Sequence, residues 1–367
     1  MSQNCKPCLL EARLDFSVIG KISLFLGLTS LFFLSGLPET GAQTVMKEVG
    51  YKVAILGEIP RVAENVGMSL NDGGEAAFWQ EKPDLTVQAV RWNGKELVQL
   101  GAPAGYFNSI GRAINSRGVV VGWAVSTRNP VDSRATVHAT KFEGGKQLDL
   151  RTLGGRDSQA FGINDRGQVV GSASLKDGSR HAFLFKSGKM TQLSPLTDSP
   201  ASVAYAINDS GTAVGGCDLT PGVEHACLWK NGATIDLGAL PAGKTSMARA
   251  LNNQEEVVGY AGAGDEIHAF LWRKGKMIDL GTLGNEPSGA NGINNKSQIV
   301  GSSKAGRKGL HAFIWENGKM QDLNSRIPID SGLLLREAYS INESGKIVCL
   351  ASDKTGHFYA ALLTPNP

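Results

Sequence analysis

Hydrophobic and polar positions follow one pattern that repeats along most of this chain. Short runs in which apolar residues alternate with small or polar ones end in Ile or Leu followed by Asn. A later run of each unit reads His-Ala-Phe-Leu-Trp or a close relative of it. Seven copies of each landmark are present, with the first landmark at Asn71, Asn115, Asn164, Asn208, Asn252, Asn294 and Asn342. These landmarks lie 42 to 49 positions apart, which indicates one repeat architecture rather than two or three separate domains.

The third unit shows which elements the pattern predicts. Its innermost run ends at Asn164-Asp165-Arg166-Gly167, an Asx-type turn with a glycine where a positive φ is needed, so this run and the next form a hairpin. The runs rich in Val and aromatic residues that follow are typical of strands. Strands are predicted over residues 158–163, 168–172, 181–185 and 190–196. Four short antiparallel strands in about 45 residues make the blade of a β-propeller.

The two ends of the repeat region indicate how the blades close into a ring. Residues 51–57 (YKVAILG) align with the fourth strand of a later unit, residues 275–281 (GKMIDLG), whereas the last unit stops after its third strand, residues 359–363. The first run therefore completes the last blade, which removes an open sheet edge. The sequence predicts an all-β fold, a seven-bladed β-propeller of four-stranded antiparallel blades closed by pairing an N-terminal strand into the last blade.

The landmarks also resemble a known repeat. Residues 162–171 read GINDRGQVVG and residues 268–284 read HAFLWRKGKMIDLGTLG, which is similar to the HAF repeat of bacterial extracellular proteins. The resemblance covers about residues 51–363. It implies export and a propeller-like repeat, and it implies no enzymatic activity and no catalytic residues.

The segment before the repeats has the layout of a secretory leader. Residues 22–37 are uncharged and mostly apolar, Lys21 precedes them, and Thr40 and Ala42 are small residues suited to cleavage before Gln43. We expect a signal peptide over 1–42, a linker over 43–49 and the propeller over 50–367. The leading stretch is long for a signal peptide, so an uncleaved membrane anchor remains an alternative. Either reading predicts a secreted, periplasmic or cell-surface protein.

Charge and cysteine content narrow the partners. The chain carries 37 Lys and Arg against 34 Asp and Glu, and the basic residues are scattered, so nucleic acid is not an expected partner. The propeller holds three cysteines, an odd number that argues against a disulfide framework. Cys217 and Cys227 flank one hairpin and either pair or pack as small hydrophobic residues, and packing is the favoured reading. We expect a monomer.

One column of the repeat contains the candidate binding residues. The residues four and two before each landmark Asn are small, as expected where blades converge on the axis. The residue between them is large and differs from blade to blade, which suits an asymmetric ligand in the channel. Inter-blade packing and a water-filled channel without a ligand are the alternatives. The candidates are Arg112, Phe161, Tyr205, Arg249, Asn291 and Tyr339, with Met68 at the same position of the first unit.

Other recurrent residues indicate structure rather than chemistry. Five His residues open successive third strands and point outward in different blades, so they cannot converge on a metal, and we expect them to support contacts between blades. The recurrent Asp-Leu pairs at Asp149, Asp236, Asp279 and Asp322 predict turn or strand partners. No nucleotide-binding, hydrolase-elbow or metalloprotease motif is present. No catalytic residue, metal or cofactor is therefore expected.

Two interruptions of the repeat predict a working face. Extra loops near residues 126–134 and 324–335 emerge on the same side of the disc, opposite the uniform Asn turns. The leading hypothesis is an exported, non-catalytic binding or scaffold protein that engages a glycan, peptide or surface protein through this face and the channel mouth. The alternatives are a lyase or hydrolase with its site at the channel mouth, and a membrane-anchored structural envelope protein.

Overall fold

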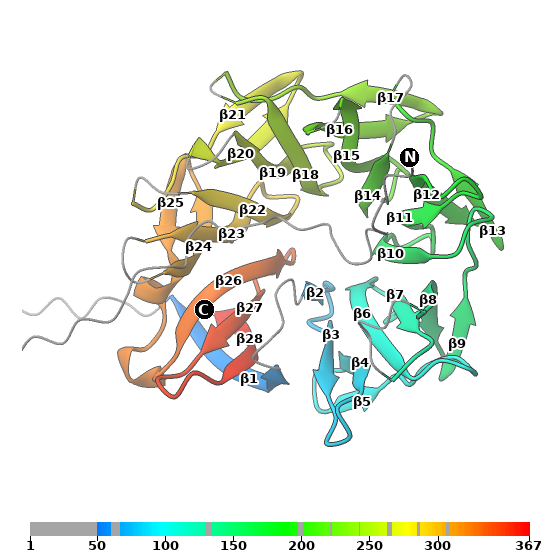
Figure 1. Cartoon of the computed structure of the whole chain (residues 1–367). Coiled ribbons are helices and arrows are strands. Elements are labelled where there is room, and N and C mark those ends of the chain that lie inside the picture. The colour runs from blue at the N-terminus through cyan, green and yellow to red at the C-terminus, as the bar shows by residue number, and fades with distance from the viewer. Residues whose placement is uncertain are drawn as a thin grey trace, which may run out of the picture.

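Seven four-stranded antiparallel sheets stand around a central axis as the blades of a propeller (Figure 1). This computed structural model describes residues 50–59, 67–128, 134–196, 201–220, 222–241, 243–262, 266–284, 287–305 and 309–367. Within them the predicted fold class is confirmed, with seven blades of four strands each. The leader predicted over 1–42 and the linker predicted over 43–49 lie outside the described residues.

Each blade runs from an innermost strand at the axis to an outermost strand at the rim. The strands of blades 1 to 4 are β2 (Ser69–Leu70), β3 (Ala76–Glu81), β4 (Val87–Trp92), β5 (Leu97–Gln99), β6 (Asn108–Ile114), β7 (Val120–Val125), β8 (Val137–Glu143), β9 (Lys146–Asp149), β10 (Ser158–Ile163), β11 (Val169–Ser174), β12 (Arg180–Lys186), β13 (Lys189–Gln192), β14 (Ser202–Ile207), β15 (Ala213–Thr220), β16 (Val223–Lys230) and β17 (Ala233–Asp236). Those of blades 5 to 7 are β18 (Thr245–Leu251), β19 (Val257–Gly262), β20 (His268–Arg273), β21 (Lys276–Asp279), β22 (Ser288–Ile293), β23 (Ile299–Lys304), β24 (Leu310–Glu316), β25 (Lys319–Asp322), β26 (Leu334–Ile341), β27 (Ile347–Ser352), β28 (Phe358–Pro365) and β1 (Tyr51–Ile59).

Blade 7 contains the two ends of the described chain. Its strand order is β1-β28-β27-β26, and β1 pairs with β28 along its whole length, from Tyr51 opposite Pro365 to Ile59 opposite Phe358. Figure 1 shows the blue first strand beside the red last one. Leu56 and Ile59 are 5% and 2% exposed, in the apolar layer between blades 7 and 1. The predicted closure is therefore confirmed.

The outermost strand of blade 3 is shorter than the sequence pattern predicted. The run expected over 190–196 forms β13 only as far as Gln192. The N–H of Leu193 still donates to the carbonyl of Ala182, and the chain then leaves the sheet. An outermost strand pairs on one side only, so it can end early without leaving ladder groups of a further strand unpaired.

The landmark Asn residues link the blades into a closed ring of hydrogen bonds. Each side-chain amide donates to the backbone carbonyl of the landmark Asn in the next blade, at 2.9 to 3.2 Å, while each residue is 2–5% exposed. The seventh link, from Asn342 to Asn71 at 3.0 Å, joins the last blade to the first. The same side chains close the hairpins, as when Asn164 Oδ1 accepts the N–H of Gln168. One residue type thus serves both the turn and the ring.

A second series of hydrogen bonds runs beside the first and is incomplete. In six of the seven blade junctions the N–H of the residue after the landmark Asn donates to the side chain at the same position in the next blade, for example Asp165 to Asp209 at 3.0 Å. Five further links of this kind join other neighbouring blades. Between blades 1 and 2 the acceptor position holds Ser116 in place of an Asp, Asn or Glu, and no link is seen there.

The recurrent histidines support the blade that carries them, which corrects the expectation of contacts between blades. Nδ1 lies 2.7–2.9 Å from a carboxylate at the end of the next strand in four pairs: His138–Asp149, His225–Asp236, His268–Asp279 and His311–Asp322. These Asp side chains also accept the N–H two residues on, so their prediction as turn partners is confirmed. In blade 3 Gln192 replaces the Asp, and Nδ1 of buried His181 has no hydrogen-bond partner among the described residues.

Serines, not histidines, connect the third strand of one blade to the first strand of the next. In five consecutive blade junctions the serine hydroxyl accepts the N–H of the Ala or equivalent residue after the His position, at 2.8–3.0 Å. The serines are Ser109, Ser158, Ser202, Ser246 and Ser288. This column of serines does not stand out in the sequence, because serine is common in both turns and strands.

The three cysteines of the propeller are free thiols in the core. Cys217 and Cys227 lie on the adjacent strands β15 and β16, and both are 0% exposed, as is Cys349. Cys217 and Cys227 pack among apolar residues that include Trp229 and Ala204. The interpretation of Cys217 and Cys227 as small hydrophobic residues is therefore confirmed.

Candidate ligand-binding channel

The six candidate residues occupy one equivalent position, a β-bulge in the innermost strand of blades 2 to 7. In blade 3 Ala160 pairs with Gly171 and Gly162 pairs with Val170, so Phe161 between them has no partner across the ladder. The same shift of register occurs in the other five blades. A bulge re-aims the extra side chain away from the sheet. The structure thereby brings together Arg112, Phe161, Tyr205, Arg249, Asn291 and Tyr339, all of which line the central channel.

The bulge explains a glycine in the second strand of five blades. At this glycine an added Cβ would lie 1.8–2.0 Å from the carbonyl oxygen two residues before the bulge. The glycines are Gly122, Gly171, Gly215, Gly259 and Gly301. Cys349 takes the place in blade 7, where a second bulge follows Leu335 and changes the backbone path. This second-strand glycine is therefore required in blades 2 to 6 by the geometry of the channel wall.

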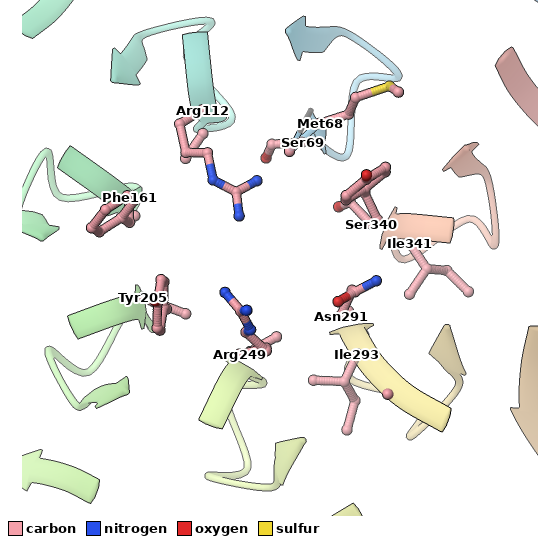
Figure 2. A pocket seen from close by; sticks show the side chains of 18 of the residues that line it. Met68, Ser69, Arg112, Phe161, Tyr205, Arg249, Asn291, Ile293, Ser340 and Ile341 are labelled. Carbon is pink, nitrogen blue, oxygen red and sulfur yellow. The ribbon is translucent and has the colours of Figure 1, made fainter. Parts of the chain in front are cut away.

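The channel encloses a cavity of about 910 Å³. Figure 2 shows that Arg112 and Arg249 reach into it from opposite sides and point toward one another, with Phe161 and Tyr205 on one side of this axis and Asn291 on the other. Nearer the Asn turns the wall is aliphatic, because the Ile or Leu before each landmark Asn lines it in blades 2 to 7. The cavity is therefore asymmetric around the ring and polar at the level of the bulges.

Arg112 carries a positive charge that no adjacent carboxylate of the described residues neutralises. Its guanidinium lies against Gly67, where even a Cβ would come 1.7 Å from Nη1, so the first blade leaves it room. Burial, and after it the nearby cation of Arg249, lower the pKa of Arg112. Arg112 forms no ion pair with a carboxylate of the described residues, so its charge would be stabilised by an anion in the channel.

Arg249 is held by aromatic faces rather than by a carboxylate. Its guanidinium carbon lies 4.5 Å from the ring centroid of Tyr205 and 5.6 Å from that of Tyr260. Burial lowers the pKa of Arg249, but Tyr205, Tyr260 and the acidic groups around them outweigh burial and raise it. Tyr260 also takes a hydrogen bond from Arg249, and a guanidinium has further N–H donors for a ligand.

The side of the channel opposite Phe161 and Tyr205 contains a carboxylate, Glu337, that hydrogen bonds already hold in place. Glu337 Oε2 accepts the hydroxyl of Tyr339 at 2.8 Å, and Oε1 accepts the side-chain amide of Asn291 at 2.9 Å. Burial, and then Glu337, raise the pKa of Tyr339 well above its usual range, so this hydroxyl keeps its proton. The group is a rigid set of acceptors and donors in the wall of the channel.

Sequence reasoning missed part of the site. Tyr260 and Ser302 also line the channel, and both lie eight residues after a landmark Asn, next to the second-strand glycine. In blade 2 this position holds Trp123, which packs edge-on against Phe161 at a centroid distance of 5.8 Å. The column contains Trp79, Trp123, Ser172, Gly216, Tyr260, Ser302 and Leu350. This position varies from blade to blade, and the same kind of variation identified the candidate residues at the β-bulges.

The extra loops lie on the predicted face but outside the channel wall. Both the β7–β8 connection and the β25–β26 connection leave the face opposite the Asn turns, and the second contains the short helices η3 (Leu323–Arg326) and η4 (Ile329–Ser331). The amide of Asn108 donates to the carbonyls of Thr127 and Arg128 and so fixes the base of the first loop. No described residue of either loop lines the channel, and residues 129–133 are outside the described part of the chain.

A largely buried carboxylate next to Gly216, Glu224, predicts a pH-dependent stability. Burial, then Asp218, raise the pKa of Glu224 to about 7, against a partial opposing effect of Arg249. Between about pH 4.5 and 7 the unfolded chain loses this proton before the folded chain does, so stability falls as pH rises and the loss is complete above about 7. Replacing Glu224→Gln should therefore raise the free energy of unfolding by about 2 kcal/mol more at pH 8 than at pH 4.

Urea denaturation of the wild type and of Glu224→Gln at the two pH values measures this difference. Glu96→Gln is the matched control, because Glu96 is exposed on a hairpin turn. A gain from Glu224→Gln that was equal at both pH values would show that the carboxyl group does not titrate in this range.

Fold and channel together define a β-propeller with an asymmetric polar pocket on its axis. In the described residues, no helix is long and apolar enough to cross a bilayer, and no group of three or more His, Cys, Asp and Glu side chains is placed to hold a metal ion. These are properties of residues 50–367 with the gaps given above.

Comparison with known proteins gives likenesses of fold. No protein-family model and no curated protein matches the chain. TolB from Acinetobacter baumannii is similar with a TM-score of 0.44 and 11% identity, over 80% of this chain and 64% of TolB, so this chain spans less than two thirds of TolB. An acylaminoacyl peptidase from Pyrococcus horikoshii has a TM-score of 0.48 and 13% identity, over 77% of this chain and 49% of the peptidase. At these values the likeness carries no information on ligand or activity.

Proposed function

We propose that this protein is an exported, non-catalytic binding or scaffold protein that holds a glycan, peptide or surface protein in its central channel, entered from the face with the extra loops. The leader pattern of residues 1–42 and the resemblance to the HAF repeat support export. The observation that carries the binding function is the set of residues at the β-bulges of the innermost strands. Six equivalent backbone distortions present six side chains of differing chemistry to one cavity, of a size that suits a small ligand or the end of a larger one.

The chemistry of the wall fits binding better than turnover. Tyr339 keeps its proton and donates it in a hydrogen bond to Glu337, and Glu337 has both oxygens engaged. A tyrosine that acts as a general base must first lose its proton, and the raised pKa of Tyr339 opposes that loss. Tyr339 is therefore better suited to positioning a ligand than to moving a proton.

Glycan and peptide arrays test the proposal when they are probed with wild type and with a channel-blocking variant. Gly289 lines the channel, and an added Cβ there would meet only Tyr260 Cβ, at 3.8 Å. Gly289→Trp should therefore fill the channel without disturbing the strand and reduce binding at least about tenfold. Thr191→Trp, on the exposed outermost strand of blade 3, is the matched control and should bind as wild type. Silence on both arrays, or binding unaffected by Gly289→Trp, would contradict the function.

A further inference from the structure

The charges that face the channel indicate which ligand chemistry it accepts. Arg112, Arg249 and Glu337 are the charged side chains among the described lining residues, so the wall carries one net positive charge. Glu337 is engaged by Tyr339 and Asn291, and neither arginine forms an ion pair within the described part of the chain. Two cations that point toward one another repel, and an anion placed between them removes that repulsion.

The form of the two cations selects for a planar oxyanion. The arginines lie on opposite sides of the channel, and each presents the N–H edge of a guanidinium, which forms paired hydrogen bonds with a carboxylate. Arg249 is fixed by its aromatic neighbours, and Arg112 lies against the backbone of Gly67. Because both side chains start from bulged backbone, they are positioned before any ligand arrives.

The rest of the channel wall indicates that the ligand is larger than a simple anion and has further groups to bind. A cavity of about 910 Å³ is far larger than an isolated ion, so the anion belongs to a larger molecule. On one side of the arginine axis Phe161 and Tyr205 form an aromatic surface, with ring centroids 5.2 Å apart, suited to a flat apolar face. The hydroxyl of Tyr205 has no hydrogen-bond partner among the described residues, although Tyr205 is only 6% exposed.

The other side of the axis is suited to hydroxyl groups. Each oxygen of Glu337 accepts one hydrogen bond and keeps a further lone pair for a ligand hydroxyl. Ser69, Ser302 and Ser340 lie in the same cavity. At the Asn-turn end the aliphatic ring offers no polar partner, so a polar ligand is held at the level of the bulges and enters from the opposite face.

From this juxtaposition, and resting on the proposed function, we propose that the channel binds an acidic sugar. The carboxylate of a uronic-acid unit lies between Arg112 and Arg249, the apolar face of the sugar ring lies toward Phe161, and ring hydroxyls bond to Glu337 and the tyrosine hydroxyls. A peptide carboxyl terminus matches the arginines but supplies few hydroxyl groups for the opposite wall. The sugar is therefore the ligand that uses all parts of the cavity.

Calorimetric titration of the full chain with a panel of oligouronates tests this inference. Trimers of galacturonate, glucuronate, mannuronate and guluronate are compared with their methyl esters and with the neutral trimers. We expect at least one uronate to bind, its methyl ester to bind at least about 30-fold more weakly, and Arg112→Gln and Arg249→Gln each to weaken binding by a similar factor. Arg166→Gln, an exposed hairpin residue on the opposite face, should bind as wild type.

A second pair of probes separates the ligand class from the existence of the site. Tripeptides with a free or an amidated carboxyl terminus are titrated alongside, and each ligand that binds is tested on Gly289→Trp. Binding of a neutral glycan or of a free-carboxyl peptide, lost in Gly289→Trp while all uronates fail, would overturn the acidic-sugar inference and leave the binding function standing. If no probe of any class binds in the channel, both proposals fail. Unchanged melting temperatures of the two Arg→Gln variants show that the loss is not one of folding.

Discussion

Deletion of residues 50–59 is expected to abolish cooperative unfolding of the propeller. The deletion removes β1, leaves the N–H and C=O groups of β28 that face β1 without partners, and takes Tyr51, Leu56 and Ile59 out of two apolar layers. Burial of three such side chains contributes about 5–8 kcal/mol, which is comparable to the whole stability of a typical domain. Calorimetry should show a broad or absent transition, and size-exclusion chromatography should show association through the exposed edge.

Two point variants distinguish the effect of closing the ring from the effect of removing ten residues. Leu56→Asp places a carboxylate in the layer between blades 7 and 1, whereas Ile55→Asp changes the neighbouring residue, which is 53% exposed. Leu56→Asp should destabilise by at least about 3 kcal/mol and Ile55→Asp by less than about 1 kcal/mol. A deletion variant that melted as sharply and as hot as the intact protein would contradict a closed ring.

Asn208→Asp should strongly destabilise the ring although it changes one amide nitrogen to oxygen. The new carboxylate still accepts the N–H of Thr212 and so preserves the hairpin turn. It cannot donate to the carbonyl of Asn252, 3.2 Å away, and instead places a buried charge beside an acceptor. We expect a loss of about 3 kcal/mol or more at pH 7, measured by urea denaturation.

Acidification distinguishes this cause from a general defect. Burial raises the pKa of an unpaired carboxyl group, and the protonated group regains a donor for the carbonyl of Asn252. The deficit of Asn208→Asp relative to wild type should therefore shrink between pH 7 and pH 4. Ser116→Asn tests the other series of hydrogen bonds between blades, the one formed by the residues after the landmark Asn. It supplies the acceptor that this series lacks between blades 1 and 2, and it should stabilise the protein by about 0.5–1 kcal/mol. A deficit of Asn208→Asp that stayed constant with pH would show that the loss does not come from a buried carboxylate charge.

The repeat made the architecture predictable because each structural requirement recurs in the sequence. Gly162 and Ala160 are small since the neighbouring innermost strand approaches them, with Tyr205 O only 2.9 Å from a Cβ placed at Gly162. The alignment of residues 51–57 with a fourth strand predicted β1 and its partner. The bulge itself was not predictable, because an extra unpaired residue at the same position in blades 2 to 7 leaves the spacing of the repeat unchanged.

The chemistry of the channel was only half accessible from the sequence. Column comparison identified Arg112 and Arg249, but it could not show that they converge, since that depends on which of seven blades face one another. The partner of each His was misjudged for a related reason. His138 and Asp149 are eleven residues apart on adjacent strands, a separation that the repeat pattern alone does not distinguish from a contact in the next blade.

The pairing of Tyr51 with Pro365 also constrains the order in which the protein can assemble. A growing chain makes β1 before any other strand of the propeller, but the partner of that strand, β28, is made only after all the others. Until then the early segment has no place in any finished sheet, and the longest loop in the molecule stays open. Such a distant contact is slow to form because the chain entropy lost on closing the loop comes before any stabilising contact. The last step of folding is therefore the one that turns a row of blades into a rigid channel.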